Sequence, residues 1–253
     1  MGVHEPAPPA DPHPVVVKGM NNWWRCVQGA VALLYPPECV LCGRPLDTTG
    51  VLCPSCRATL RPIDGPRCRR CADRLDDPRA DVCLRCGTHV RFVDRLIAVG
   101  AYDDGWGRVV RTFKFDRERA AGRFLGEVLA DYAERTLDPA GADVVTFVPM
   151  TLRERRRRGF NPARVLAKAV SRRLDLPLRT TLMKARDTRP QATLPQAERE
   201  VNLRGAFRSV RSHTQRVLLV DDICTTGSTA EECARTLKEH GCTAVTVLTV
   251  ARA

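Results

Sequence analysis

Eight cysteines in four Cys-x2-Cys pairs constrain the fold of this chain more than any other feature. The pairs lie within 48 residues, from Cys39 to Cys86. Two thiolates at this spacing bind one Zn²⁺, and a second pair completes a tetrahedral site that leaves no open position for catalysis. We therefore expect two structural Zn²⁺ sites, whose ligands are Cys39, Cys42, Cys53, Cys56, Cys68, Cys71, Cys83 and Cys86.

Spacing alone leaves open which cysteine pairs share a metal. Gaps of 10, 11 and 11 residues separate the pairs, so sequential and interleaved arrangements fit equally well. We favour the sequential arrangement, a double zinc ribbon over residues 39–90. A segment this small lacks a sufficient core, so the metal would supply much of its folding free energy. We expect the ribbons to bind nucleic acid, bind a partner protein or brace the neighbouring domain, and to unfold without metal while the rest stays largely intact.

The residues before the cysteines show no secretory signal. Residues 1–19 are rich in Pro, Ala and His without a basic start, and we expect them to be disordered. Residues 20–38 are expected to hold a short helix, and Met20 is an alternative start. No apolar stretch approaches the roughly 18 residues that span a bilayer. We therefore expect a cytoplasmic protein with no membrane span. In the reducing cytoplasm, paired cysteines bind metal more often than they form disulfides.

From residue 91 onward, short apolar strands alternate with helical patterns. The expected strands are residues 96–102, 144–148, 217–220 and 244–250, and the expected helices are residues 106–115, 121–136, 162–174 and 228–240. Continuous apolar strands that alternate with helices indicate an α/β fold, with a parallel sheet flanked by helices on both faces. We expect this domain to span residues 91–253.

The segment from Val217 to Thr229 carries the most chemical information. A buried strand brings Asp221 and Asp222 to the edge where α/β folds bind their ligands. A loop of small polar residues follows and opens a helix, so its N–H groups, hydroxyls and helix dipole suit a phosphate. Adjacent carboxylates would repel a simple phosphate, but they suit a ligand that also offers hydroxyls and a nearby Mg²⁺. Ribose 5-phosphate activated at C1 by pyrophosphate meets these requirements.

This segment resembles the signature of type I phosphoribosyltransferases. The resemblance implies that Asp221 and Asp222 are catalytic and hold the ribose hydroxyls of phosphoribosyl pyrophosphate (PRPP). It also implies that the following loop holds the 5-phosphate, through Thr225, Thr226, Gly227, Ser228 and Thr229. Family members that act on 6-oxopurines have Asp where Thr225 stands, which argues against that acceptor class. Cys224 has no neighbouring His, so we do not expect a nucleophile there.

Positive charge is concentrated in one stretch of the chain. Between residues 147 and 204, fifteen Lys and Arg stand against five Asp and Glu, in a chain whose formal net charge is +12. Such a stretch suits an anionic ligand. The candidates for DNA contact, if they are not simply a solvated helix face, are Arg153, Arg155, Arg156 and Arg157. Few aromatic residues lie nearby, Phe160 being the clearest, so we expect base stacking to add little.

Several motifs together resemble the ComF family. They cover residues 20–252 in order and comprise the four cysteine pairs, Tyr102 with Lys114-Phe115, Arg158-Gly159-Phe160-Asn161, Gln191, Arg199, Asn202, Phe207 and the phosphate loop. The resemblance implies a zinc module joined to a phosphoribosyltransferase-like domain. It implies that Arg158 faces the pyrophosphate of PRPP and that Mg²⁺ accompanies PRPP. It also implies a link to natural competence, in the handling of single-stranded DNA that has entered the cytoplasm.

The residues support two classes of function. The first is an enzyme that transfers a phosphoribosyl group from PRPP to an acceptor the sequence does not identify. The second is a non-catalytic accessory of natural competence that binds single-stranded DNA or docks a helicase. Because the loop and both carboxylates are intact, we favour retained PRPP binding. Of the two classes of function, we therefore lean toward the enzyme.

Overall fold

The computed structural model describes residues 37–46, 50–88, 91–115, 119–138, 141–188, 202–210 and 215–253. The disorder predicted for residues 1–19 lies outside these ranges, as does the helix predicted from residue 20 up to residue 36. Gln191 and Arg199 also lie outside them. No helix in the described ranges is long and apolar enough to cross a membrane.

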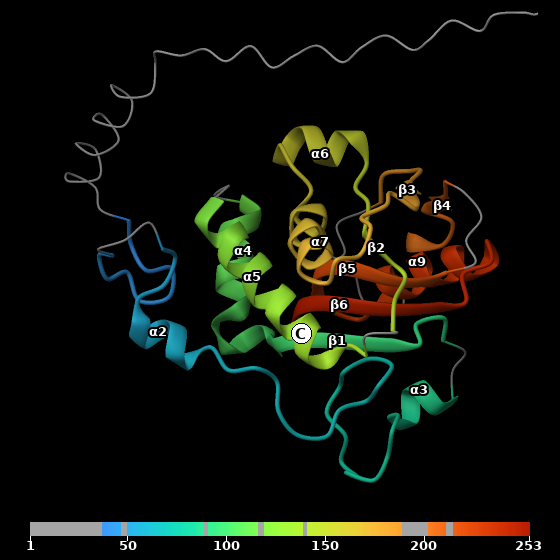
Figure 1. Cartoon of the computed structure of the whole chain (residues 1–253), viewed down its shortest axis with the longest axis horizontal. Coiled ribbons are helices and arrows are strands. Elements are labelled where there is room, and N and C mark those ends of the chain that lie inside the picture. The colour runs from blue at the N-terminus through green and yellow to red at the C-terminus, as the bar shows by residue number, and fades with distance from the viewer. Residues whose placement is uncertain are drawn as a thin grey trace, which may run out of the picture.

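Four parallel strands form the centre of the molecule (Figure 1). In spatial order they are β1 (Arg95–Ala101), β6 (Ala244–Arg252), β5 (Arg216–Cys224) and β2 (Val144–Phe147). Every neighbouring pair is parallel, and the middle of each strand is buried. The predicted parallel sheet is confirmed. A continuous apolar run places apolar side chains on both faces of a strand, so it is stable only where both faces of the sheet are covered.

Helices cover both faces of this sheet. The helices α4 (Gly107–Phe115), α5 (Arg119–Thr136) and α7 (Pro162–Arg173) pack on one face, where Leu125 and Leu166 join the core. On the opposite face α9 (Ser228–Glu239) buries Leu237 against alternate residues of the same strands. These helices begin and end within two residues of the predicted bounds, because their apolar periodicity is strong.

Two features beside the sheet were not predicted from the sequence. The helix α6 (Leu152–Arg158) is short and arginine-rich, so it has no apolar periodicity. The strands β3 (Leu182–Lys184) and β4 (Phe207–Ser209) form a separate antiparallel pair. Each is three residues long, too short for an alternating pattern to stand out. Both features matter because α6 and β3 contribute residues to the cavity described below.

The two cysteine-rich ribbons pack against the α/β domain. The first ribbon (residues 39–56) ends within α2 (Pro54–Thr59), and Val51 and Leu60 are buried in the same core cluster as α4 and α5. The second ribbon (residues 68–86) ends within α3 (Leu84–Thr88). Near it the chain runs along β1, where the Ile63 N–H donates to the Val99 carbonyl at 2.7 Å. The ribbons therefore share a core and an edge with the α/β domain, a relation that cysteine spacing does not reveal.

Trp106 joins the sheet to the segment between the ribbons. It ends the irregular turn η1 (Tyr102–Trp106), and its side chain is only 2% exposed. A Cβ added at Gly100 would lie 2.0 Å from the indole Nε1, so only glycine allows this packing. The indole N–H donates to the Arg61 carbonyl at 3.0 Å. The segment between the ribbons is thereby held against the side of the domain that carries α4, α5 and α7.

Candidate functional site

The eight ribbon cysteines gather in two sequential groups of four. Within each group all four sulfur atoms lie within 4.8 Å of one another. The Sγ atoms of Cys42 and Cys53 are 3.8 Å apart, and those of Cys71 and Cys83 are 3.7 Å apart. A tetrahedral site with Zn–S bonds of about 2.3 Å requires sulfur atoms about 3.8 Å apart, whereas a disulfide requires about 2.0 Å. The donor sets therefore fit Zn²⁺, and the sequential pairing is confirmed.

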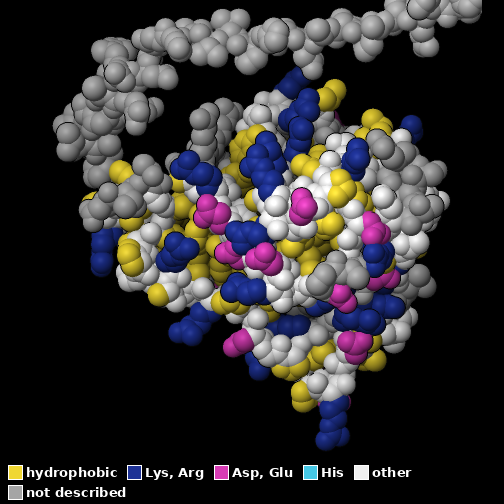
Figure 2. Space-filling model, viewed as in Figure 1, with side chains coloured by type: hydrophobic (Ala, Val, Ile, Leu, Met, Phe, Trp, Pro, Cys, Tyr) yellow, Lys and Arg dark blue, Asp and Glu magenta, His cyan; other side chains and the backbone are white. Residues whose placement is uncertain are grey.

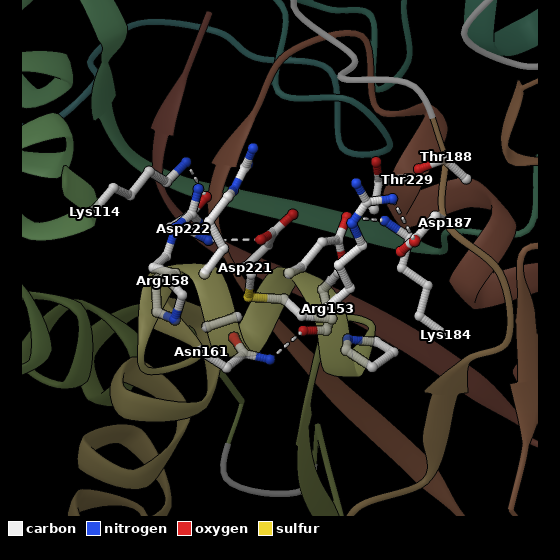
Figure 3. Close-up of a pocket in the computed structure, with 17 residues that line it drawn as sticks. Lys114, Arg153, Arg158, Asn161, Lys184, Asp187, Thr188, Asp221, Asp222 and Thr229 are labelled. Atoms are coloured by element: carbon white, nitrogen blue, oxygen red, sulfur yellow. Dashed lines mark hydrogen bonds and ion pairs between the residues drawn. The ribbon is translucent and has the colours of Figure 1, made fainter.

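The carboxyl ends of the central strands face a cavity of about 480 Å³ (Figure 3). The strand β5 brings Asp221 and Asp222 to it, and β2 leads into Pro149 on another wall. Five cationic side chains line the cavity, namely Lys114, Arg153, Arg157, Arg158 and Lys184. The acidic ones are Glu154, Asp187, Asp221 and Asp222. A cavity with both signs of charge suits a ligand that carries anionic groups together with hydroxyls or a cation.

The two adjacent carboxylates differ in their surroundings. Asp222 is buried, and its Oδ1 lies 2.7 Å from the ammonium of Lys114. Asp221 accepts a hydrogen bond from the Asp222 N–H at 2.8 Å. Burial and then the neighbouring Asp222 charge raise the pKa of Asp221 to about 7, while Lys114 acts in the opposite direction. Lys114 was not predicted as a site residue, although its place beside Phe115 in the ComF-like motif was a signal for it.

The loop after β5 has a conformation and side chains that suit an anion. Gly227 precedes the first residue of α9 with φ of +83°, a left-handed conformation that favours glycine. The hydroxyls of Thr226 and Ser228 lie 2.9 Å apart, and Thr229 reaches the main cavity. The first N–H groups of a helix have no backbone partner within it. That of Ser228 donates to the Thr226 hydroxyl at 3.4 Å, and those that follow it can donate to a ligand. Burial raises the pKa of the Cys224 thiol to about 12, which makes it a poor nucleophile.

The arginines of α6 divide into two sets. The helix begins at a capping box, in which Thr151 accepts from the Glu154 N–H and Glu154 accepts from the Thr151 N–H. Residues four apart lie on one side of a helix, so Arg153 and Arg157 line the cavity, and Arg158 lines it as well. The side chains of Arg155 and Arg156 are exposed and do not line it. Figure 2 shows basic side chains gathered over α6.

Other cavity residues have no signal in the local sequence. Lys184 on β3 forms an ion pair with Glu154, with Nζ and Oε1 2.7 Å apart. Asp187 accepts a hydrogen bond from the Thr151 hydroxyl at 2.6 Å. These contacts attach the segment after β3 to the start of α6, and Figure 3 shows both residues beside Arg153. Only the tertiary structure brings them to Asp221 and Asp222.

Fold and site together define a class of protein. A parallel sheet with an acidic pair and a Thr/Gly/Ser loop at its carboxyl edge, preceded by two four-cysteine sites, describes a phosphoribosyltransferase-like domain with a double zinc ribbon. Comparison with family models agrees with this description. The "Double zinc ribbon domain" matches residues 30–87, and the "Phosphoribosyl transferase domain" matches residues 161–253.

Curated relatives identify the family. "Competence protein F" of Haemophilus influenzae is 30% identical over 211 residues, covering 80% of this chain and 90% of that protein. "DNA utilization protein YhgH" of Escherichia coli K12 is 29% identical, covering 90% of this chain and 96% of that protein. "Competence protein ComFC" of Streptococcus pneumoniae is 25% identical, covering 85% and 100%. The chain belongs to the ComF family.

Proposed function

We propose that this protein binds PRPP with Mg²⁺ in the cavity and transfers the phosphoribosyl group to an acceptor, as part of single-stranded DNA handling in the cytoplasm. One observation carries the proposal. Asp221 and Asp222 lie at the end of β5, between the loop that opens α9 and a cavity lined by five cationic side chains. This arrangement offers separate partners to a ribose, to its 5-phosphate and to a pyrophosphate.

Each part of PRPP has a matching group of residues. Asp221 and Asp222 would accept hydrogen bonds from the ribose hydroxyls. The loop from Thr225 to Thr229 would hold the 5-phosphate through its hydroxyls and the first N–H groups of α9. Arg158 would contact the pyrophosphate, with Arg153 and Arg157 on the same wall. Negative charge grows on the pyrophosphate as the C1–O bond breaks, so fixed cations at that place stabilise the transition state.

The acidic pair also fits Mg²⁺. This ion is usually bound by one or two carboxylates together with oxygens of the substrate phosphates and water. When bound it would neutralise part of the pyrophosphate charge. Lys114 neutralises Asp222 when no ligand is bound, because their charged atoms are 2.7 Å apart. Binding of Mg²⁺ and PRPP would therefore require this lysine to give up part of its contact with Asp222.

A thermal shift experiment tests the proposal. PRPP with Mg²⁺ should raise the melting temperature, because a ligand at a hundredfold excess over its Kd stabilises the native state by about 2.7 kcal/mol. The double substitution Asp221→Asn and Asp222→Asn should abolish the shift, whereas Arg155→Ala, outside the cavity, should keep it. A wild-type protein without any shift at millimolar PRPP would refute the enzyme proposal.

The pH dependence of this binding has a defined sign. Since the pKa of Asp221 is raised from 3.8 to about 7, the carboxyl is protonated at lower pH. Mg²⁺ binds the ionised form, so affinity for Mg²⁺ and PRPP should increase up to about pH 7 and then level off. The unliganded protein should behave oppositely, losing stability as pH rises from about 4 to about 7, because ionisation is then more costly in the folded state. Asp222→Asn should move both midpoints to lower pH, since it removes a neighbouring negative charge.

A non-catalytic role in DNA uptake is the second candidate function, with the ribbons or the cavity face docking DNA or a helicase. The observation that favours it is the exposure of Arg155 and Arg156 outside the cavity, in a chain similar to "Competence protein F". Each phosphate contact contributes about 0.7 to the slope of log affinity against log salt for single strands. Substituting Arg155 and Arg156 by Ala should flatten this slope, and PRPP binding should remain. Single-stranded DNA binding without a PRPP shift would favour this candidate.

A further inference from the structure

The last turn of α4 carries two adjacent side chains with different surroundings. Lys114 reaches into the cavity and contacts Asp222. Phe115 is 67% exposed and belongs to neither hydrophobic core cluster. Among the described residues, it is the only aromatic one in the set of exposed large hydrophobic side chains. An isolated apolar side chain on the surface is common, but this ring has a cationic neighbour.

The guanidinium of Arg158 lies over the Phe115 ring. Its central carbon is 5.5 Å from the ring centroid, within the range of a cation–π contact. Arg158 also lines the cavity, at the end where Figure 3 shows Lys114 and Asp222. An aromatic ring and a planar cation therefore lie together at the border of the candidate site. Phe115 and Arg158 are far apart in sequence, so only the fold brings them together.

The aromatic residue that the sequence singled out has a different environment. Phe160 packs against the buried Phe113, with their ring centroids 5.1 Å apart. Its ring belongs to the helical layer, which leaves little surface for a ligand. The expectation that base stacking adds little follows from the few aromatic residues near the basic stretch, of which Phe160 is the clearest. Phe115 lies outside that stretch, 43 residues before Arg158.

We propose that Phe115 and Arg158 form a stacking platform for a nucleobase at the Lys114 end of the cavity. Every nucleobase has a π face, and aromatic and guanidinium groups stack with it without strong sequence preference. Arg153 and Arg157 on the neighbouring wall provide partners for the phosphates that accompany a base. The base belongs either to an acceptor of the phosphoribosyl group or to a strand of DNA. The stacking platform rests on the proposed function, because that function assigns the cavity to ligands that carry phosphate.

Fluorescence anisotropy with two probes tests the platform. An oligothymidylate and an abasic oligomer of equal length and charge share their phosphates and differ only in the bases. The wild type should bind the oligothymidylate about 5- to 160-fold more tightly, the range that alanine substitution gives for stacking of one base. Phe115→Leu keeps an apolar side chain without a π face, so it should bring the two affinities together. Met183→Leu, at a side chain 51% exposed on β3, is the matched control and should keep the preference.

A second variant separates the two sources of the base. In Phe115→Trp, quenching of the added indole fluorescence by adenine or thymine in the presence of Mg²⁺ and PRPP would identify an acceptor base. Quenching by the oligothymidylate alone would identify a DNA strand, and either result supports the platform. If Phe115→Leu retains the base preference and Phe115→Trp is quenched by neither probe, the platform does not exist.

Failure of the platform is distinguishable from failure of the PRPP proposal. Because Phe115 is exposed, Phe115→Leu should melt at the wild-type temperature and keep the shift with PRPP and Mg²⁺. A wild-type protein with no PRPP shift but a Phe115-dependent base preference would support the platform and refute PRPP binding. The opposite pair of results would refute the platform alone.

Discussion

The two zinc ribbons share a ligand chemistry but are attached to the α/β domain by different forces. The first ribbon is attached by apolar packing, since Val51 and Leu60 are buried among the side chains of α4 and α5. Figure 1 shows α2 beside these helices and α3 beyond β1, which is an edge strand of the sheet. The second ribbon buries the smaller side chain of Ala72 in the core cluster on the opposite face of the sheet. Hydrogen bonds therefore contribute a larger share of its attachment, such as the one from the Leu96 N–H to the Arg69 carbonyl at 2.7 Å.

Arg252 gives the second ribbon a link to the candidate site. Its side chain is 9% exposed, and its Nε donates to the Cys71 carbonyl at 2.9 Å. The same guanidinium donates to the Cys224 carbonyl at 3.3 Å and to the Thr225 carbonyl, where the phosphate loop begins, and it pairs with Asp73. Identical Cys-x2-Cys pairs can therefore support a core in one place and contact the loop after β5 in another, depending on the residues around them.

The largest expected effect comes from removing one ligand of each ribbon in turn. Cys39→Ser should unfold the first ribbon and take Val51 and Leu60 out of the core, at about 1.5–3 kcal/mol for each side chain. The unfolding free energy of the α/β domain should fall by roughly 3–6 kcal/mol. Cys68→Ser should cost less, since the second ribbon buries a smaller side chain and depends more on hydrogen bonds of about 0.5–1.5 kcal/mol each. Urea denaturation followed by circular dichroism measures both.

Two controls accompany these variants. Elemental analysis should find two Zn²⁺ per chain in the wild type and one in each variant. Cys242→Ser changes a buried cysteine outside both ribbons, whose thiol donates to the Gln215 and Ala244 carbonyls, so a hydroxyl can replace it. Equal losses of stability from Cys39→Ser and Cys68→Ser would remove the distinction between the ribbons. A C-terminal domain unaffected by either would restore the view of the ribbons as an independent unit.

An intermediate effect is expected from the arginines that attach each ribbon. Arg252→Met removes the donor that joins the second ribbon to the start of the phosphate loop, so PRPP with Mg²⁺ should bind more weakly, on the order of tenfold for one charged hydrogen bond. Arg108→Met is the matched control, because Arg108 donates to the Leu41 carbonyl of the first ribbon at 2.9 Å. It should leave PRPP binding unchanged. Isothermal titration compares them, and equal affinities in both variants would separate the second ribbon from the site.

The smallest effect is expected at Trp106, which holds the segment between the ribbons. Trp106→Phe removes the indole N–H that donates to the Arg61 carbonyl. The loss of one neutral hydrogen bond should lower the unfolding free energy by about 1 kcal/mol. PRPP affinity should stay at the wild-type value, because Trp106 packs on the helical side and does not line the cavity. A change in PRPP affinity would show that the attachment of the segment between the ribbons also affects the site.

Local chemistry and periodicity were sufficient to predict much of this protein. The cysteine pairs lie close in sequence, and their tight spacing limits the geometries they can adopt, so both zinc sites were predictable. The strands and helices of the sheet were predictable because their apolar runs are long. The acidic pair and its loop are contiguous, which is why Asp221 to Thr229 stand out without any knowledge of the fold.

Contacts between distant segments were decided only by the tertiary structure. Lys114 meets Asp222, Phe115 meets Arg158, and Arg252 meets the second ribbon across separations of 43 to about 180 residues. Which of the α6 arginines line the cavity also depends on where the helix lies, since no apolar face marks its orientation. Charged and aromatic side chains at the surface follow no periodic rule, because each member of such a pair could also face water without its partner. Only packing of the sheet, helices and ribbons places them together, and that packing is a property of the whole chain.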